Sequence, residues 1–72
     1  MTAFVLWWDV DRGHGFARSE DGDVFVHYTA IIDGMHCHQW RDELNLLSGQ
    51  TIEFDPVAGT IGTAAANVRV VA

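Results

Sequence analysis

The stretch D-V-F-V-H-Y, at residues 23–28, alternates aliphatic and aromatic side chains. Successive side chains of a β-strand point to opposite faces, so Val24 and Val26 share one face while Phe25 and His27 share the other. A strand with one solvent-facing side normally carries polar groups on that side. The phenylalanine opposite the valines therefore indicates either a second apolar layer or a partner that covers the rings.

A second alternating segment, H-G-F-A-R-S at residues 14–19, places His14 and Phe16 on one face of a strand. The Asp-Gly pair at 21–22 is a strong hairpin signal, so the two segments are expected to pair as antiparallel strands. Their rings would then form one contiguous patch, which Trp7 on the preceding apolar run is placed to join.

Exposed rings are unfavourable in water unless they bind something flat. Unpaired nucleobases are flat, and each base stacked on an aromatic ring contributes about 1–3 kcal/mol. The rings could instead fill the core, because a small barrel also needs large apolar side chains inside. The pattern alone leaves both interpretations open.

Three further segments have the composition of strands: A-F-V-L-W-W-D (3–9), Q-T-I-E-F-D (50–55) and N-V-R-V-V (67–71). Five short strands with tight early hairpins predict an all-β fold, a small antiparallel barrel. Residues 33–49 depart from this pattern, because Trp40, Leu44 and Leu47 recur at helical spacing. One or two turns of helix are predicted there, inserted between the third and fourth strands.

Length and composition limit the architecture to a single domain over residues 1–72. A hydrophobic content of 49% with a single proline favours a folded globule. The one cysteine excludes an internal disulfide, and no targeting segment or long apolar run is recognisable. We therefore expect a soluble cytoplasmic protein with no membrane partner.

No phosphate-binding glycine loop, nucleophile elbow or paired catalytic carboxylate motif is recognisable, so no enzyme activity, cofactor or small-molecule substrate is predicted. His36, Cys37 and His38 lie beside acidic residues and are types that can bind a metal ion. No second cluster with ligand spacing accompanies them, so no metal site is predicted.

The charge balance argues against a phosphate-rich partner, because 10 acidic residues oppose 4 arginines and give a net charge of −6. Screening limits the reach of exposed charges to roughly 8–10 Å at cellular salt, so acids on the far side of a barrel act weakly on a bound strand. We therefore expect weakened binding with a shallow salt dependence, rather than no binding.

Five segments resemble those of bacterial cold-shock proteins, in the same order. R-G-H-G-F-A (12–17) is similar to the family's RNP1 motif, K-G-F-G-F-I, and D-V-F-V-H-Y-T-A-I (23–31) to its RNP2 region, D-V-F-V-H-F-S-A-I. V-L-W-W-D (5–9), S-G-Q-T-I-E-F (48–54) and A-A-A-N-V (64–68) match V-K-W-F-N, G-Q-x-V-x-F and A-x-N-V. The resemblance implies a five-stranded OB-type barrel that binds single-stranded RNA or DNA, as an RNA chaperone or a regulator of transcription or translation.

The resemblance also implies the contact residues. The family's base-stacking places fall on Trp7, Phe16, Phe25, His27 and Tyr28, and the lysine that opens RNP1, a phosphate contact, falls on Arg12. Trp40 is either a further stacking ring from the loop or an anchor for the predicted helix. His14 stands in place of the first RNP1 phenylalanine. It is either a polar surface substitution or a stacking imidazole, which would bind more strongly when protonated in mild acid.

Several positions differ from the family pattern. Leu6 replaces a surface lysine, Trp8 a phenylalanine and Asp9 an asparagine, and the segment between the third and fourth strands is longer. These changes allow an alternative function. A degenerate cold-shock domain could serve as a protein-interaction module, with residues 33–48 as the candidate surface for a protein partner.

Overall fold

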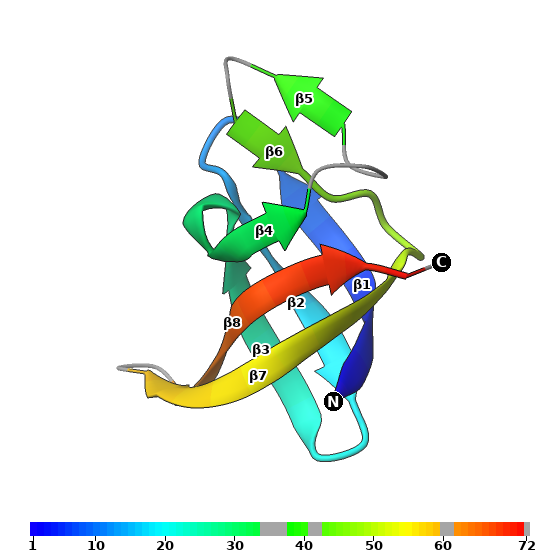
Figure 1. Ribbon diagram of the computed structural model, residues 1–72, viewed down its shortest axis with the longest axis vertical. Helices are drawn as coiled ribbons and strands as arrows, with labels where there is room; N and C mark the ends of the chain where they lie inside the picture. Colours follow the sequence, from blue (N-terminus) through cyan, green and yellow to red (C-terminus); the bar gives the residue numbers. More distant parts are fainter. Residues whose placement is uncertain (34–37, 41–42, 60–61, 72) are drawn as a thin grey trace.

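The computed structural model describes residues 1–33, 38–40, 43–59 and 62–71. Its strands are β1 (Thr2–Asp9), β2 (His14–Ser19), β3 (Gly22–His27), β4 (Ile31–Asp33), β5 (His38–Trp40), β6 (Glu43–Asn45), β7 (Thr51–Gly59) and β8 (Gly62–Val70). A 3₁₀ turn, η1 (Tyr28–Ala30), joins β3 to β4 (Figure 1).

Five long strands close into a barrel. Neighbours in the order β3-β2-β1-β7-β8 are antiparallel, and a short parallel pairing of β3 with β8, where Phe25 lies opposite Ala64, closes the barrel. The short strand β4 adds to β8 in parallel, with Ile31 opposite Val68. The predicted all-β barrel of the OB type is confirmed. The last two strands are longer than predicted, because β7 and β8 continue to the hairpin where Gly59 pairs with Gly62.

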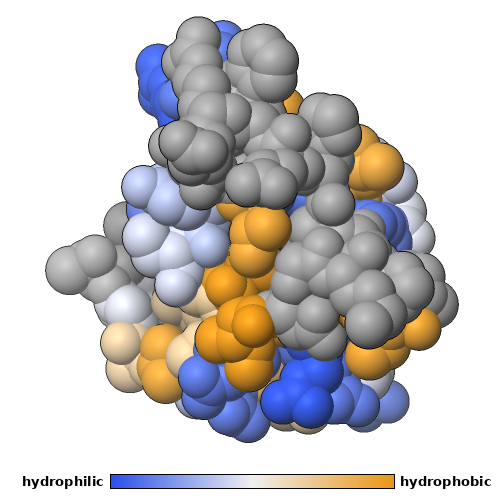
Figure 2. All heavy atoms as spheres, turned by 45° about the horizontal axis from the view of Figure 1, so that its top comes forward, coloured by the Kyte–Doolittle hydropathy of each residue, from blue (hydrophilic) through white to orange (hydrophobic). Residues whose placement is uncertain are grey.

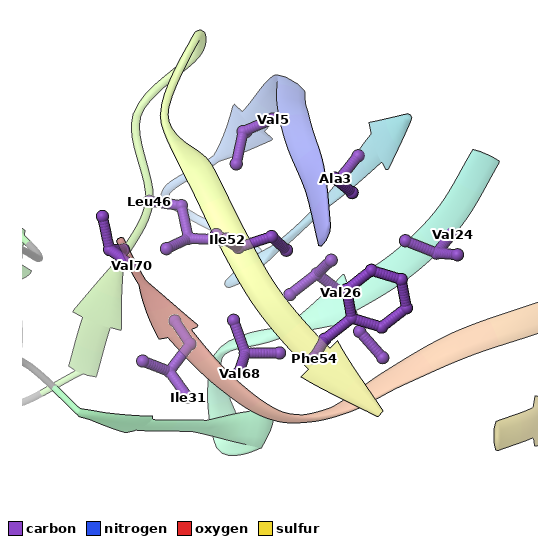
Figure 3. Packing of buried hydrophobic residues seen from close by; sticks show 12 residues of the cluster. Ala3, Val5, Val24, Val26, Ile31, Leu46, Ile52, Phe54, Val68 and Val70 are labelled. Atoms are coloured by element: carbon purple, nitrogen blue, oxygen red, sulfur yellow. The ribbon is translucent and has the colours of Figure 1, made fainter. Parts of the chain in front are cut away.

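The core is built from the inward positions of these strands (Figure 3). Val24 and Val26, on the predicted inner face of β3, are 3% and 1% exposed. Aliphatic side chains from the other strands complete the cluster, and Phe54 contributes the one aromatic ring among its described buried members. The interpretation of the patterned rings as core is therefore wrong, because aliphatic side chains supply most of the interior.

A β-bulge at Leu6 determines which face of β1 carries Trp7. Simple alternation would place Trp7 on the inner face with Ala3 and Val5, which are both buried. The register with β2 instead shifts between Val5 and Trp7, so that one extra residue is accommodated. Trp7 consequently points outward and is 45% exposed, while Trp8 packs against the core.

The loop that follows β6 holds this bulge in place. The Ser48 hydroxyl donates a hydrogen bond of 2.9 Å to the carbonyl oxygen of Leu6. The amide of Gly49 donates to the Val5 carbonyl at 2.7 Å, and the Val5 amide donates to the Gln50 carbonyl at 2.8 Å. The S-G-Q segment thus has a structural role, because Ser48 satisfies the carbonyl oxygen of the bulged residue Leu6 while Gly49 and Gln50 hold the adjoining residue Val5.

The predicted helix within residues 33–49 is wrong where the chain is described. Residues 38–40 and 43–45 form the antiparallel strands β5 and β6 at one end of the barrel (Figure 1). Leu46 is buried and Leu44 packs against the core, whereas Leu47 is 55% exposed. The exposed Leu47 does not share a buried face with Leu44, so the helical spacing that includes Leu47 was coincidental. Residues 34–37 and 41–42 lie outside the described residues.

Trp8 connects this hairpin to the barrel. Its indole Nε1–H donates a hydrogen bond of 2.8 Å to Oδ1 of Asn45, whose side chain is buried at 1% exposure. The net contribution of such a hydrogen bond to stability is about 0.5–1.5 kcal/mol, and loss of one partner of a buried polar group can cost somewhat more. The hydrogen bond from Trp8 to Asn45 thus joins β1 to β6, two strands that are far apart in sequence.

Replacing Trp8 with phenylalanine removes this donor but keeps an aromatic ring. We expect the free energy of unfolding to fall by about 1–2 kcal/mol in denaturant titrations. The matched control is Trp7→Phe at the exposed neighbouring position, which should change stability by no more than about 0.5 kcal/mol. Equal stability of the two variants would contradict a structural role for the Trp8 hydrogen bond.

No helix in the described part of the chain is long and apolar enough to cross a membrane. On the face shown in Figure 2, hydrophobic side chains lie interspersed with hydrophilic ones. Ile32, Val57 and Val71 are among the exposed apolar side chains. Single exposed apolar residues of this kind are common on protein surfaces and carry no functional meaning on their own.

Candidate nucleic-acid interface

Aromatic rings cover the outer face of three adjacent strands. We call this surface the ring platform. Its members are Trp7 on β1, His14 and Phe16 on β2, Phe25 and His27 on β3, and Tyr28 at the start of η1. Each ring lies within contact range of at least one other, so the six form a connected surface.

Strand pairing brings the central rings together. Phe16 lies directly opposite Phe25 and next to Trp7 in the register of the sheet. Its ring centroid is 5.6 Å from that of Trp7 and 5.7 Å from that of Phe25. These separations are within the favourable range for aromatic pairs, about 4.5–7 Å, so the rings support one another's positions. The predicted gathering of the rings on one face is confirmed.

The two histidines lie at the end of the platform near Tyr28. His14 is opposite His27, and its ring lies 6.1 Å from Trp7 and 5.5 Å from Phe25. The His27 ring is 6.5 Å from Phe25 and 4.7 Å from Tyr28. The imidazoles thus occupy ring positions within the platform instead of pointing away from it.

A local cap orients His27. Its Nδ1 accepts a hydrogen bond of 3.3 Å from the Thr29 amide and lies 2.8 Å from the Thr29 hydroxyl oxygen. The Tyr28 amide donates to the Gly13 carbonyl at 2.8 Å, which ties the start of η1 to the turn before β2. Tyr28 therefore leaves the strand that was predicted to contain it, yet its ring remains beside the platform while also packing against the core.

Gly15 allows β1 and β2 to approach closely behind the platform. It is buried, and a Cβ atom at this position would overlap the carbonyl oxygen of Trp7 and lie 2.9 Å from Cε3 of Trp8. Only glycine leaves room for this backbone contact. The glycine between His14 and Phe16 is therefore part of the geometry that positions Trp7 against Phe16.

The cations beside the platform are paired with acids. Arg12 is highly exposed in the turn before β2, with Nε 3.9 Å from Oδ2 of Asp9. Arg18, on the outer face of β2, forms a 3.1 Å contact with Asp23 across the hairpin. Exposed ion pairs contribute only about 0–1 kcal/mol to stability. They nevertheless reduce the positive potential of the surface beside the platform.

Two sequence predictions cannot be placed on this surface. Trp40 lies on β5, where the structure describes the backbone alone. His36 and Cys37 lie outside the described residues, and within the described part of the chain no three or more metal-ligand side chains come together. The structural role of Trp8 was not predicted, because its hydrogen bond to Asn45 joins segments that are distant in sequence.

A five-stranded barrel of this kind is the architecture of the OB-fold class, whose members bind oligonucleotides on the face of the second and third strands. The comparisons with known proteins narrow this class. Residues 1–71 match the family model of the 'cold-shock' DNA-binding domain. The chain is therefore a member of the cold-shock domain family.

Curated relatives match nearly the whole chain. It is 43% identical over 70 residues to the cold shock-like protein CspG of Escherichia coli, covering 94% of this chain and 90% of that protein. It is 44% identical over 69 residues to the cold shock-like protein CspC of Bacillus cereus, covering 94% and 95%. A cold shock-like protein of Aquifex aeolicus is 44% identical over 68 residues, covering 92% and 87%.

Proposed function

We propose that this protein binds single-stranded RNA or DNA by stacking unpaired bases on the ring platform. The observation that carries the proposal is that the platform rings form a connected outer surface while aliphatic side chains fill the core. Rings that the fold does not need inside can contact a ligand. Membership of the cold-shock domain family supports the same function.

The cellular role that follows is that of an RNA chaperone or a regulator of transcription or translation. Stacking tolerates every base, because each base has a flat face, so binding would have little sequence preference. A protein of this kind keeps RNA single-stranded without catalysing a reaction. We therefore propose a cytoplasmic, non-enzymatic protein whose activity needs no cofactor or metal.

Within the platform, Trp7, Phe16 and Phe25 are proposed as the main stacking surfaces, with His27 and Tyr28 at one end. Arg12 is proposed to contact phosphate, since its side chain is 76% exposed and its ion pair with Asp9 is long, at 3.9 Å. Three or four stacked bases at about 1–3 kcal/mol each outweigh modest repulsion from a net charge of −6. The affinity therefore comes mainly from the rings.

The proposal can be tested by titrating the protein with oligouridylate and oligothymidylate and following tryptophan fluorescence, in which Trp7 should be quenched by stacked bases. We expect saturable quenching with a shallow salt dependence, because each phosphate contact to a single strand contributes a slope of only about −0.7. Double-stranded DNA is the control and should quench weakly. If no single strand quenched the fluorescence, the proposal would be refuted, and the remaining hypothesis would be that the protein is a protein-interaction module.

A second prediction concerns pH. A protonated His14 would place a cation within the platform, where it attracts phosphate, so binding of oligothymidylate should strengthen in mildly acidic solution. The rings of Trp7 and Phe25 lie beside His14, with His27 opposite it on β3 and Asp9 opposite it on β1. The variant His14→Gln should lose part of this pH dependence while keeping its fold. An affinity that is the same in mild acid and mild base would contradict the prediction.

A further inference from the structure

The outer face that carries the ring platform continues toward the other end of β1 and β2. Arg18 lies two residues beyond Phe16 on β2, and alternation therefore places it on the same face. Phe4 on β1 is directly opposite Arg18, on the N-terminal side of the bulge at Leu6, and Trp7 lies opposite Phe16 on the other side of that bulge. Phe4 is 47% exposed, which is close to the 45% of Trp7.

A hollow lies in the surface at this end. Its volume is about 340 Å³, and it is lined by Thr2, Ala3, Phe4, Arg18, Ser19, Glu20 and Thr51. This volume is at the lower end of the range for small-ligand sites, about 300–1,000 Å³. The lining combines an aromatic ring, a guanidinium group and hydroxyl groups, which suit a base, a phosphate and a sugar respectively.

We propose that Phe4 and Arg18 form a further nucleotide subsite, occupied by one nucleotide of the same single strand that crosses the ring platform. Its base would stack on Phe4, and the adjoining phosphate would contact Arg18. The inference rests on the proposed function. Continuity supports it, since Phe4 is only three residues before Trp7 on β1, about 10 Å at roughly 3.3 Å per residue.

The charges at this end are compatible with the subsite. Arg18 contacts Asp23 through Nε at 3.1 Å, and its side chain remains 58% exposed. A guanidinium carries five N–H donors, so this contact leaves capacity for a phosphate. The carboxylate of Glu20 at the hollow opposes a phosphate, which limits the gain. The expected contribution is therefore in the lower part of the range for a stacked base.

The test measures affinity for oligothymidylates that grow by one nucleotide at a time, with wild-type protein and Phe4→Ala. Short oligomers that cover the ring platform alone should bind both proteins equally. At the length that reaches Phe4, wild-type affinity should rise by about 5- to 10-fold, and Phe4→Ala should lack this step. Arg18→Gln should reduce the magnitude of the salt slope by about 0.7 for the longer oligomers.

Two further variants of Phe4 distinguish base stacking on an aromatic ring from the effect of apolar volume. Phe4→Trp should retain the step, and Phe4→Leu, which is apolar but has no ring, should lose it. Identical length dependence of wild type and Phe4→Ala would overturn the inference while leaving the proposed function intact, whereas failure of the wild type to bind any oligomer would remove both. If Phe4→Ala instead abolished a concentration-dependent self-association seen by sedimentation, the surface would be a protein contact and the subsite would be refuted.

Discussion

Replacing both Phe16 and Phe25 with alanine is expected to abolish most of the affinity for short single strands. Each ring offers a stacking surface worth about 1–3 kcal/mol per base, so each single variant should weaken oligothymidylate binding by roughly 5- to 150-fold. The two rings contact each other, with centroids 5.7 Å apart, so their effects need not be additive. Fluorescence titration of the two single variants and the double variant measures the coupling directly.

The fold should survive these substitutions, because both rings are only partly buried and the core lies on the opposite face of the sheet. Phe16→Leu and Phe25→Leu keep apolar bulk and remove the flat ring, so they should lose affinity with a smaller loss of stability than the alanine variants. Val71→Ala, at an exposed apolar position off the platform, should leave binding unchanged. Equal affinity of the double variant and the wild type would show that bases do not stack on these rings.

Gly15→Ala is expected to have the largest effect on stability. The new Cβ would overlap the Trp7 carbonyl oxygen, which is backbone and can move only if β1 separates from β2. Overpacking of this kind costs about 1–3 kcal/mol and sometimes more, and a backbone overlap should reach the upper value. Small domains have about 5–15 kcal/mol of stability in total, so the variant should be only marginally folded. Denaturant unfolding measures the loss.

The variant Gly22→Ala is a control that distinguishes the cost of steric overlap from the cost of an unfavourable backbone conformation. Gly22 has a φ of +117°, and a Cβ there meets nothing within 4 Å, so the cost is conformational alone, about 1–2 kcal/mol. Gly15→Ala should be clearly less stable than this control. Where it still folds at low temperature, it should also bind single strands more weakly, because Trp7 is displaced from Phe16. Comparable stability of the two variants would contradict the close approach at Gly15.

Much of the site could be predicted because it depends on local patterns. Phe16 and Phe25 share a face since both strands alternate regularly and a tight turn joins them, and these are properties of adjacent residues. The valines of β3 were likewise assigned correctly to the interior. The role of the rings in binding nucleic acid was inferred from resemblance and stays a proposal.

The errors occurred where contacts between distant segments decide the structure. Leu44 and Leu47 suggested a helix, but the exposed position of Leu47 and the burial of Leu46 follow from docking against the barrel. The bond from Trp8 to Asn45 joins residues 37 positions apart, and no local pattern reveals it. Phe4 was read only as part of an apolar strand, because its position opposite Arg18 appears only once the strands are in register.

The alternation of the sequence by itself determined a small all-β protein with rings gathered on one face of its central hairpin, because side-chain direction in a strand depends only on the period of two. The tertiary structure alone decided that Trp7 faces outward. The extra residue at Leu6 reverses the alternation, and hydrogen bonds that join Leu6 and Val5 to Ser48, Gly49 and Gln50, more than forty residues later in the chain, stabilise that bulge. No pattern of neighbouring residues predicts such contacts, because these segments come together only when the barrel closes.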